Sequence, residues 1–228
     1  MAVRYNPKIV SDGLLFAVDA ANSRSYPGSG TSVSDISNNG KNSDGVFDFP
    51  TWDGSCFHFN GTDEEIKFPN ISTSTNNFSV ECWANWDVVE TDTVPFGHGS
   101  FFRFFIGSAN RLTFWIRETG SGSTATVQEP TAEISAGRWY QLVGTVQGPL
   151  NGPGSRKVYR DGVLRGSETL SFNVSGGNGT NNMTMGNGYN GATSYFDGKV
   201  AIARVYDKVL TDNEIVQNYN ALKGRFGL

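Results

Sequence analysis

The chain has 228 residues and a formal net charge of −4, a length that suits one large all-β domain or two small ones. Its 18 basic residues are scattered with no run longer than two, which excludes the basic stripe of a nucleic-acid or anionic-membrane surface. Hydrophobic residues make up 37% and charged residues 18% of the chain, a balance typical of a protein with a packed core rather than a disordered one.

No window approaches the ~20 apolar residues of a membrane span. The first residues lack the apolar core of a signal peptide, so we expect neither membrane insertion nor a cleaved signal.

Short alternating segments separated by turn-forming residues predict an all-β protein. The expected strands lie at 13–20, 55–61, 65–70, 77–87, 100–107, 111–118, 138–147, 182–188 and 195–207, with a hairpin over 156–170. Asp161-Gly162 marks the turn of that hairpin, because a tight type I′ turn needs positive φ at both central residues. The segments 22–45 and 119–137 are rich in turn formers and are predicted to be loops. The absence of a linker favours a single domain over 13–228, preceded by an N-terminal arm over 1–12.

The last thirty residues predict a central strand followed by one short helix. Both faces of the strand within 195–207 are largely apolar, as in a strand with neighbours on both sides. Thr211 and Glu214 have the spacing of a capping box. An apolar stripe and a glycine at the expected C′ position then define a helix that we expect over one end of the sandwich: Ile215, Val216, Tyr219, Leu222 and Gly224. The two cysteines, Cys56 and Cys82, lie in apolar strand-like segments and are expected to be buried free thiols.

Several motifs occur in the order of a known family. The closing stretch "FDGKVAIARVYDKVLTDNEI", with "GLLFAVDAAN", "FHFNGTDEEIKF", "NFSVECWANWD", "GRWYQLVGTV" and "KVYRDGVLRG" upstream, resembles the laminin-G-like, concanavalin A-like lectin/glucanase domains. The resemblance spans about Gly13 to Leu222. It implies a jelly-roll sandwich of two antiparallel sheets with one short C-terminal helix.

The two ends of the chain carry a narrower resemblance. "GLLFAVDAANSRSYPGSGTSVSDISNNG" and "NYNALKGRFGL" are similar to virion structural proteins of tailed bacteriophages, notably marine and cyanobacterial phages. This resemblance implies a head decoration, neck or tail-fibre module that packs against other virion proteins, often as a homo-oligomer. Such a protein would be assembled in the host cytoplasm and located in the virion, in agreement with the missing signal peptide.

The alternative function is that of a lectin module that binds host-surface glycans. Sugars stack on exposed aromatic rings while their hydroxyls bond to polar neighbours. Alternate side chains of a strand share one face. In the strand 111–118, Trp115 shares the outward face with Thr113 and Arg117. In the strand 77–87, Trp83 shares the outward face with Asn85. Either tryptophan could instead be covered by a loop or a neighbouring subunit.

Family members that hold Ca²⁺ do so through loop oxygens, which that ion prefers. The residues that the resemblance suggests here are Asp19, Asp35, Asn38 and Asp63. The alternative for each is stabilisation of its own turn.

A glycoside hydrolase is the weaker alternative, because this chemistry needs two carboxylates that flank the glycosidic bond from one strand face. The chain lacks the family's E-x-D-x-x-E pattern, since Asp63, Glu64 and Glu65 are adjacent in a turn and Glu81 stands alone on its strand. Neither His58 nor His98 has an evident nucleophile partner in the sequence. We therefore expect a protein that is not an enzyme and has no cofactor beyond that Ca²⁺.

Overall fold

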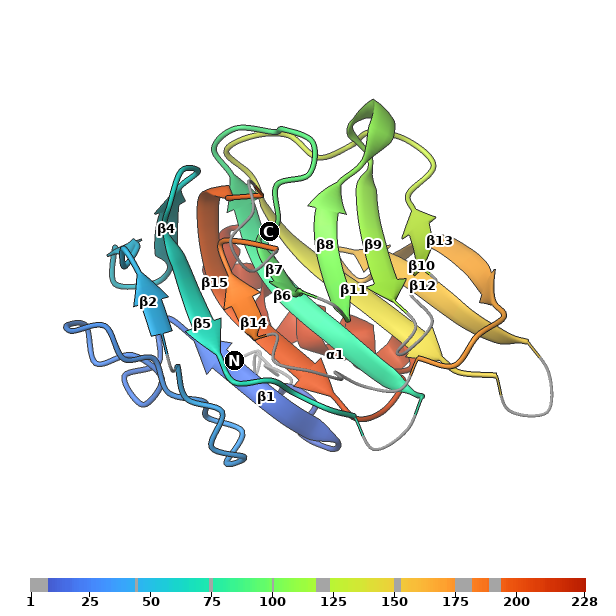
Figure 1. Cartoon of the computed structure of the whole chain (residues 1–228), viewed down its shortest axis with the longest axis horizontal. Helices are drawn as coiled ribbons and strands as arrows, with labels where there is room; N and C mark the ends of the chain where they lie inside the picture. The colour runs from blue at the N-terminus through green and yellow to red at the C-terminus, as the bar shows by residue number, and fades with distance from the viewer. Residues whose placement is uncertain are drawn as a thin grey trace, which may run out of the picture.

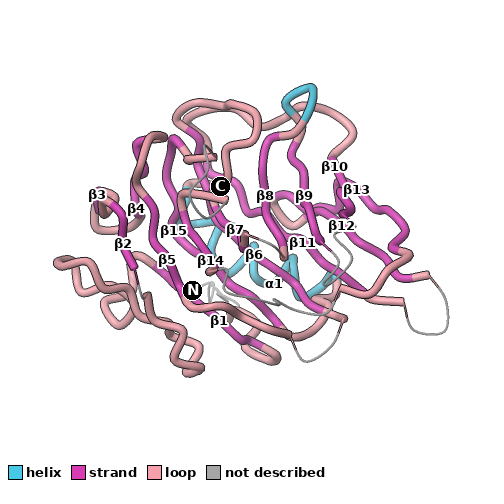
Figure 2. The backbone as a smooth tube through the Cα atoms, viewed as in Figure 1, coloured by secondary structure: helices cyan, strands magenta, loops and turns pink. Residues whose placement is uncertain are grey.

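Two antiparallel β-sheets packed face to face form the body of the molecule (Figure 1). The computed structural model describes residues 8–43, 45–73, 76–99, 101–117, 124–149, 153–174, 182–188 and 194–228. One helix, α1 (Asp212–Leu222), packs outside the sandwich and is seen behind the strands in Figure 2. The predicted fold class, a jelly-roll sandwich with one short C-terminal helix, is confirmed.

Each sheet gathers strands from distant parts of the sequence. Sheet A contains, in spatial order, β13 (Val163–Leu170), β12 (Gly154–Arg160), β11 (Trp139–Gln147), β6 (Phe78–Trp86), β15 (Asp197–Tyr206), β4 (Phe57–Asn60) and β3 (Thr51–Trp52), with β1 (Leu14–Asp19) on the second half of β15. Sheet B contains β10 (Thr124–Gln128), β9 (Leu112–Arg117), β8 (Phe102–Ile106), β7 (Phe96–His98), β14 (Met183–Met185), β5 (Glu65–Phe68) and β2 (Gly45–Phe47). Two short 3₁₀ segments, η1 (Ser108–Asn110) and η2 (Lys223–Phe226), complete the described structure.

The alternating residues of the strands build the core between the sheets. On β6, Phe78, Val80, Cys82 and Ala84 face inward and are fully buried. β15 pairs with β6 along one side and with β4 and β1 along the other, which confirms the prediction that this strand is central. Both cysteines are buried free thiols, as predicted.

The predicted turn and cap chemistry is confirmed at two places. Asp161 and Gly162, with φ of 54° and 77°, connect β12 to β13 in the tight turn that the Asp-Gly pair predicts. Thr211 and Glu214 form the reciprocal capping box at the start of α1.

Other details of the sequence prediction are wrong. The left-handed glycine after the helix is Gly227, with φ of 72°, and not Gly224, because the chain continues into η2 before it turns. The helix lies against the outer face of sheet A and not over an end of the sandwich. The predicted loop 119–137 contains β10, whose Val127 is its only buried residue.

A buried carboxylate joins the helix to sheet A. Glu81 is fully buried on the outer face of β6, beneath α1. One of its oxygens accepts hydrogen bonds from Gln141 Nε2 at 2.8 Å and Trp83 Nε1 at 3.2 Å. The other accepts from Asn218 Nδ2 of α1 at 2.9 Å and from Arg204 Nη1 at 3.1 Å, and Tyr206 lies at 3.4 Å. Five polar groups from β6, β11, β15 and α1 therefore meet at one charge.

The described part of the predicted N-terminal arm, residues 8–12, lies along the same helix. Val10 N–H donates to Asn218 Oδ1 at 2.8 Å, and the Lys8 carbonyl accepts from Gln217 Nε2 at 2.7 Å. Residues 1–7 lie outside the described residues. None of the described helices is long and apolar enough to cross a bilayer.

Replacing Glu81 by glutamine tests this joint. We expect Glu81→Gln to lower the free energy of unfolding by about 3–5 kcal/mol, because it leaves the buried Arg204 without its counter-charge. Urea denaturation provides the measurement. Glu90→Gln, at an exposed position, is the matched control and should change stability by no more than about 0.5 kcal/mol. Equal losses in the two variants would contradict a special role for Glu81.

A pH dependence follows from His98. This side chain is fully buried, its Nε2 lies 2.7 Å from Asn70 Oδ1, and burial lowers its pKa from 6.5 to about 4. Because the unfolded chain binds the proton more tightly, the free energy of unfolding should fall as the pH drops below 6.5, and this loss should end near pH 4. The total is on the order of 3 kcal/mol. Urea denaturation at several pH values between 7 and 4.5 gives the free energy of unfolding as a function of pH. This free energy should fall less steeply with decreasing pH in His98→Gln than in the wild type. Identical slopes in the two proteins would be evidence against this assignment.

Candidate functional site

The outer face of sheet B carries a cluster of two aromatic rings and a guanidinium group. Trp115 on β9 pairs in register with Arg103 on β8 and with Thr126 on β10. The Arg103 guanidinium carbon lies 4.5 Å from the Trp115 ring centroid and 5.4 Å from that of Phe105. All three side chains are half-buried. We call Arg103, Phe105 and Trp115 the aromatic platform; it presents apolar ring surface next to a cation.

Strand alternation explains why these residues face outward. The residues between them fill the core and are fully buried: Phe102, Phe104, Ile106, Leu112, Phe114 and Ile116. Thr113 and Arg117 share the outward parity of Trp115, so the structure brings together the three residues predicted on this strand. Thr113 is nevertheless fully buried, and its hydroxyl bonds to Gln128 Nε2 at 2.9 Å. Arg117 is half-buried at the end of β9. Sequence analysis missed Arg103 and Phe105, although their alternation with buried phenylalanines could have identified them.

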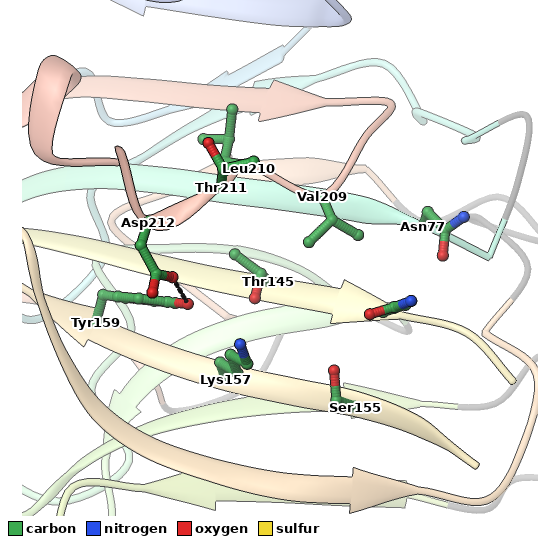
Figure 3. A pocket seen from close by; sticks show the side chains of 10 residues that line it. Asn77, Thr145, Ser155, Lys157, Tyr159, Val209, Leu210, Thr211 and Asp212 are labelled. Carbon is green, nitrogen blue, oxygen red and sulfur yellow. Dashed lines mark hydrogen bonds between the residues drawn. The ribbon is translucent and has the colours of Figure 1, made fainter. Parts of the chain in front are cut away.

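The outer face of sheet A contains a polar groove of about 270 Å³ (Figure 3). Its floor comes from β11 and β12, and one wall comes from the segment before α1. The lining residues are Asn77, Thr145, Gln147, Ser155, Lys157, Tyr159, Val209, Leu210, Thr211 and Asp212. The Tyr159 hydroxyl donates to Asp212 Oδ1 at 2.8 Å, and burial together with this bond raises the pKa of Tyr159, which stays protonated. No local sequence pattern indicates this groove, because its residues are remote in the chain.

The prediction that Trp83 and Asn85 form an exposed sugar-binding face is wrong. Trp83 does lie on the outer face of β6, but it is fully buried there. The Phe226 ring stacks on it with centroids 4.3 Å apart, and Tyr219 stacks at 6.0 Å. Asn85 is also buried. The C-terminal segment thus occupies the surface that a sugar would need.

The four residues suggested for Ca²⁺ do not fit a calcium site. The Asp35 carboxylate already accepts bonds from the N–H groups of Ala17, Ser37 and Lys41 and from the Ser37 hydroxyl, at 2.8–3.1 Å. Asp19 pairs with Arg225 Nη1 at 2.7 Å, and Asp63 accepts from Asn60 Nδ2 in the β4–β5 turn. Asn38 is an exposed turn residue with φ of 73°. Within the described ranges, no three His, Cys, Asp or Glu side chains gather as metal ligands.

Solved structures share this fold. The fourth domain of a GH43 extracellular arabinanase from Geobacillus stearothermophilus, solved with arabinotriose, is 20% identical with a TM-score of 0.65, over 90% of this chain and 98% of that chain. The binding domain of botulinum neurotoxin serotype D/C is 13% identical with a TM-score of 0.69, over 93% of this chain. This chain covers 53% of that toxin domain, about half its length. At these identities the likeness shows the fold alone.

The sequence comparisons identify the family. No curated protein sequence matches the chain significantly. None of the structures named here is a virion protein, so the phage assignment stays a prediction. Residues 60–216, more than half of the chain, match the family profile of laminin G type described as "Concanavalin A-like lectin/glucanases superfamily". The chain therefore belongs to the concanavalin A-like lectin/glucanases superfamily.

Proposed function

We propose that this chain is a non-catalytic carbohydrate-binding module that contacts glycans through its aromatic platform. The observation that carries the proposal is the half-buried Trp115 ring with the Arg103 guanidinium 4.5 Å from its centroid. The apolar face of a sugar ring stacks on an indole, and guanidinium N–H groups donate to sugar hydroxyls. Because Arg103 is already held against two rings, little side-chain entropy is lost when a sugar binds.

The solved relatives support a glycan as the class of ligand. The arabinanase domain was solved with arabinotriose, and a botulinum neurotoxin serotype D ligand-binding domain was solved with N-acetylneuraminic acid. These ligands belong to those proteins and define the range of sugars to test here. A related neurotoxin domain was solved with rat synaptotagmin II, so the fold also serves protein receptors. A virion location, which the terminal motifs suggest, is compatible with a module that contacts host glycans.

Binding without catalysis is favoured by the positions of the carboxylates. Glu81 on β6 lies under α1, and both of its carboxylate oxygens already accept hydrogen bonds. Glu64 Oε2 accepts from the Asn60 N–H, and Glu65 pairs with Lys67 Nζ at 2.8 Å. None of these three pairs with another acid across an open face, the arrangement that glycoside hydrolysis needs.

The platform is tested by a glycan array with the wild type, Trp115→Ala and Trp115→Phe. We expect Trp115→Ala to weaken glycan binding by roughly tenfold to a hundredfold, as for a tryptophan at the centre of a binding site. Trp115→Phe keeps a stacking ring and should retain most of the affinity. Thermal unfolding should be similar in all three proteins, which separates a binding defect from misfolding. Full glycan binding by a folded Trp115→Ala protein would refute the platform.

Calcium removal gives a second test. We expect EDTA to leave both glycan retention and the unfolding temperature unchanged, because Asp35 and Asp19 are saturated by hydrogen bonds and an ion pair. Thermal unfolding and the array, each with EDTA and with added CaCl₂, provide the measurement. A loss of binding in EDTA that CaCl₂ restores would show that a calcium site forms elsewhere in the chain.

A further inference from the structure

The polar groove on sheet A lies on the opposite side of the sandwich from the aromatic platform. Thr145 and Lys157 face each other across β11 and β12, as do Gln147 and Ser155. Figure 3 shows Thr145, Lys157 and Ser155 rising from these strands next to the segment that carries Asp212. The platform residues project from the outer face of sheet B. The two surfaces therefore point away from each other.

The wall of the groove is fixed in place. The Ser79 hydroxyl donates to the Lys208 carbonyl and accepts from the Leu210 N–H, each at 2.8 Å. Thr211 and Glu214 cap the helix: the Glu214 N–H donates to Thr211 Oγ1, and the Thr211 N–H donates to Glu214 Oε2. Asp212 is held by the Tyr159 hydroxyl, which donates to its Oδ1 at 2.8 Å. A groove with rigid walls is suited to binding, because little has to be ordered when a ligand enters.

Several polar side chains in this groove have no partner among the residues that the structure describes. Lys157, Ser155 and Gln147 make no side-chain hydrogen bond or ion pair with any residue in the described part of the chain. Within the same residues, Asp212 Oδ2 accepts no hydrogen bond, since Tyr159 bonds to the other oxygen. The groove thus offers a donor-only ammonium, an acceptor-only carboxylate and two groups that do both. Its volume of about 270 Å³ is close to the lower end of small-molecule pockets.

We infer that this groove is a second sugar site that takes a neutral, hydroxyl-rich ring. Hydroxyls both donate and accept, so neighbouring hydroxyls can bond to Asp212 Oδ2 and to Lys157 Nζ at the same time. An anionic ligand would be attracted by Lys157 but repelled by the Asp212 carboxylate, and the net charge of the chain is −4. A neutral ligand avoids this repulsion. The inference rests on the proposed function and extends it: the module binds glycan on two opposite faces and can bridge two glycan chains.

NMR titration of the ¹⁵N-labelled full chain separates the two sites. The probes are the methyl glycosides of glucose, galactose and mannose, arabinotriose, and N-acetylneuraminic acid as the anionic comparison. For a neutral probe that binds, we expect one set of shifts at the Trp115 indole N–H and a second at the backbone amides of Gln147, Lys157 and Asp212. Trp115→Ala should remove only the first set.

Lys157→Met should weaken binding at the groove by roughly tenfold or more and leave the Trp115 shifts in place. Lys41→Met is the matched control, since the Lys41 ammonium has no hydrogen-bond or ion-pair partner among the described residues and lies outside the groove; it should change neither set. Groove shifts that persist in Lys157→Met, or that appear only with N-acetylneuraminic acid, would overturn the inference.

The outcomes also separate this inference from the platform. Shifts at Trp115 alone, with every neutral probe, would overturn the groove and leave the platform standing. Shifts in the groove alone would support the groove and contradict the platform.

Discussion

The buried Glu81 carboxylate is the interaction on which the arrangement of this molecule depends. It neutralises Arg204 and accepts bonds from three elements of sheet A and α1 at a position that water does not reach. A buried charge is tolerated only when its partners satisfy it completely, so the strands and the helix that supply them have little freedom to shift. This constraint fixes α1 on sheet A, and α1 in turn fixes the segment before it, which is one wall of the groove.

The same constraint assigns different roles to the two outer faces. The middle of the outer face of sheet A is buried, because α1 and η2 cover Trp83 and Glu81. The β11–β12 end of that sheet stays open, as a polar groove. Sheet B has no described helix on its outer face, and its aromatic side chains at β8 and β9 stay partly accessible. The surfaces that the buried network does not occupy are therefore the ones that a ligand can reach.

Sequence reasoning located what depends on local pattern. Alternation placed β6, β8, β9 and β15, and the Asp161-Gly162 pair and the Thr211 capping box fixed a turn and a helix start, because each depends on a few adjacent residues. It failed where the cause is remote in the sequence. The outward parity of Trp83 was right, but parity cannot say that Phe226 stacks on it. β10 was missed because its mostly polar residues resemble a loop, and pairing with β9 makes it a strand. The groove joins four segments that are remote in the sequence, and no single segment predicts it.

The pairing of β1 with β15 has a kinetic consequence. These strands come from opposite ends of the sequence, and β15 is also the strand that connects β6 to β4. Sheet A therefore cannot be completed until nearly all of the described chain has left the ribosome. Pairing β1 with β15 also costs the conformational entropy of closing a very long loop. Until then Trp83 and Glu81 have no cover, since α1 and η2 follow β15. Folding of this chain should thus be slow, and the insertion of β15 into the middle of sheet A should be a late step.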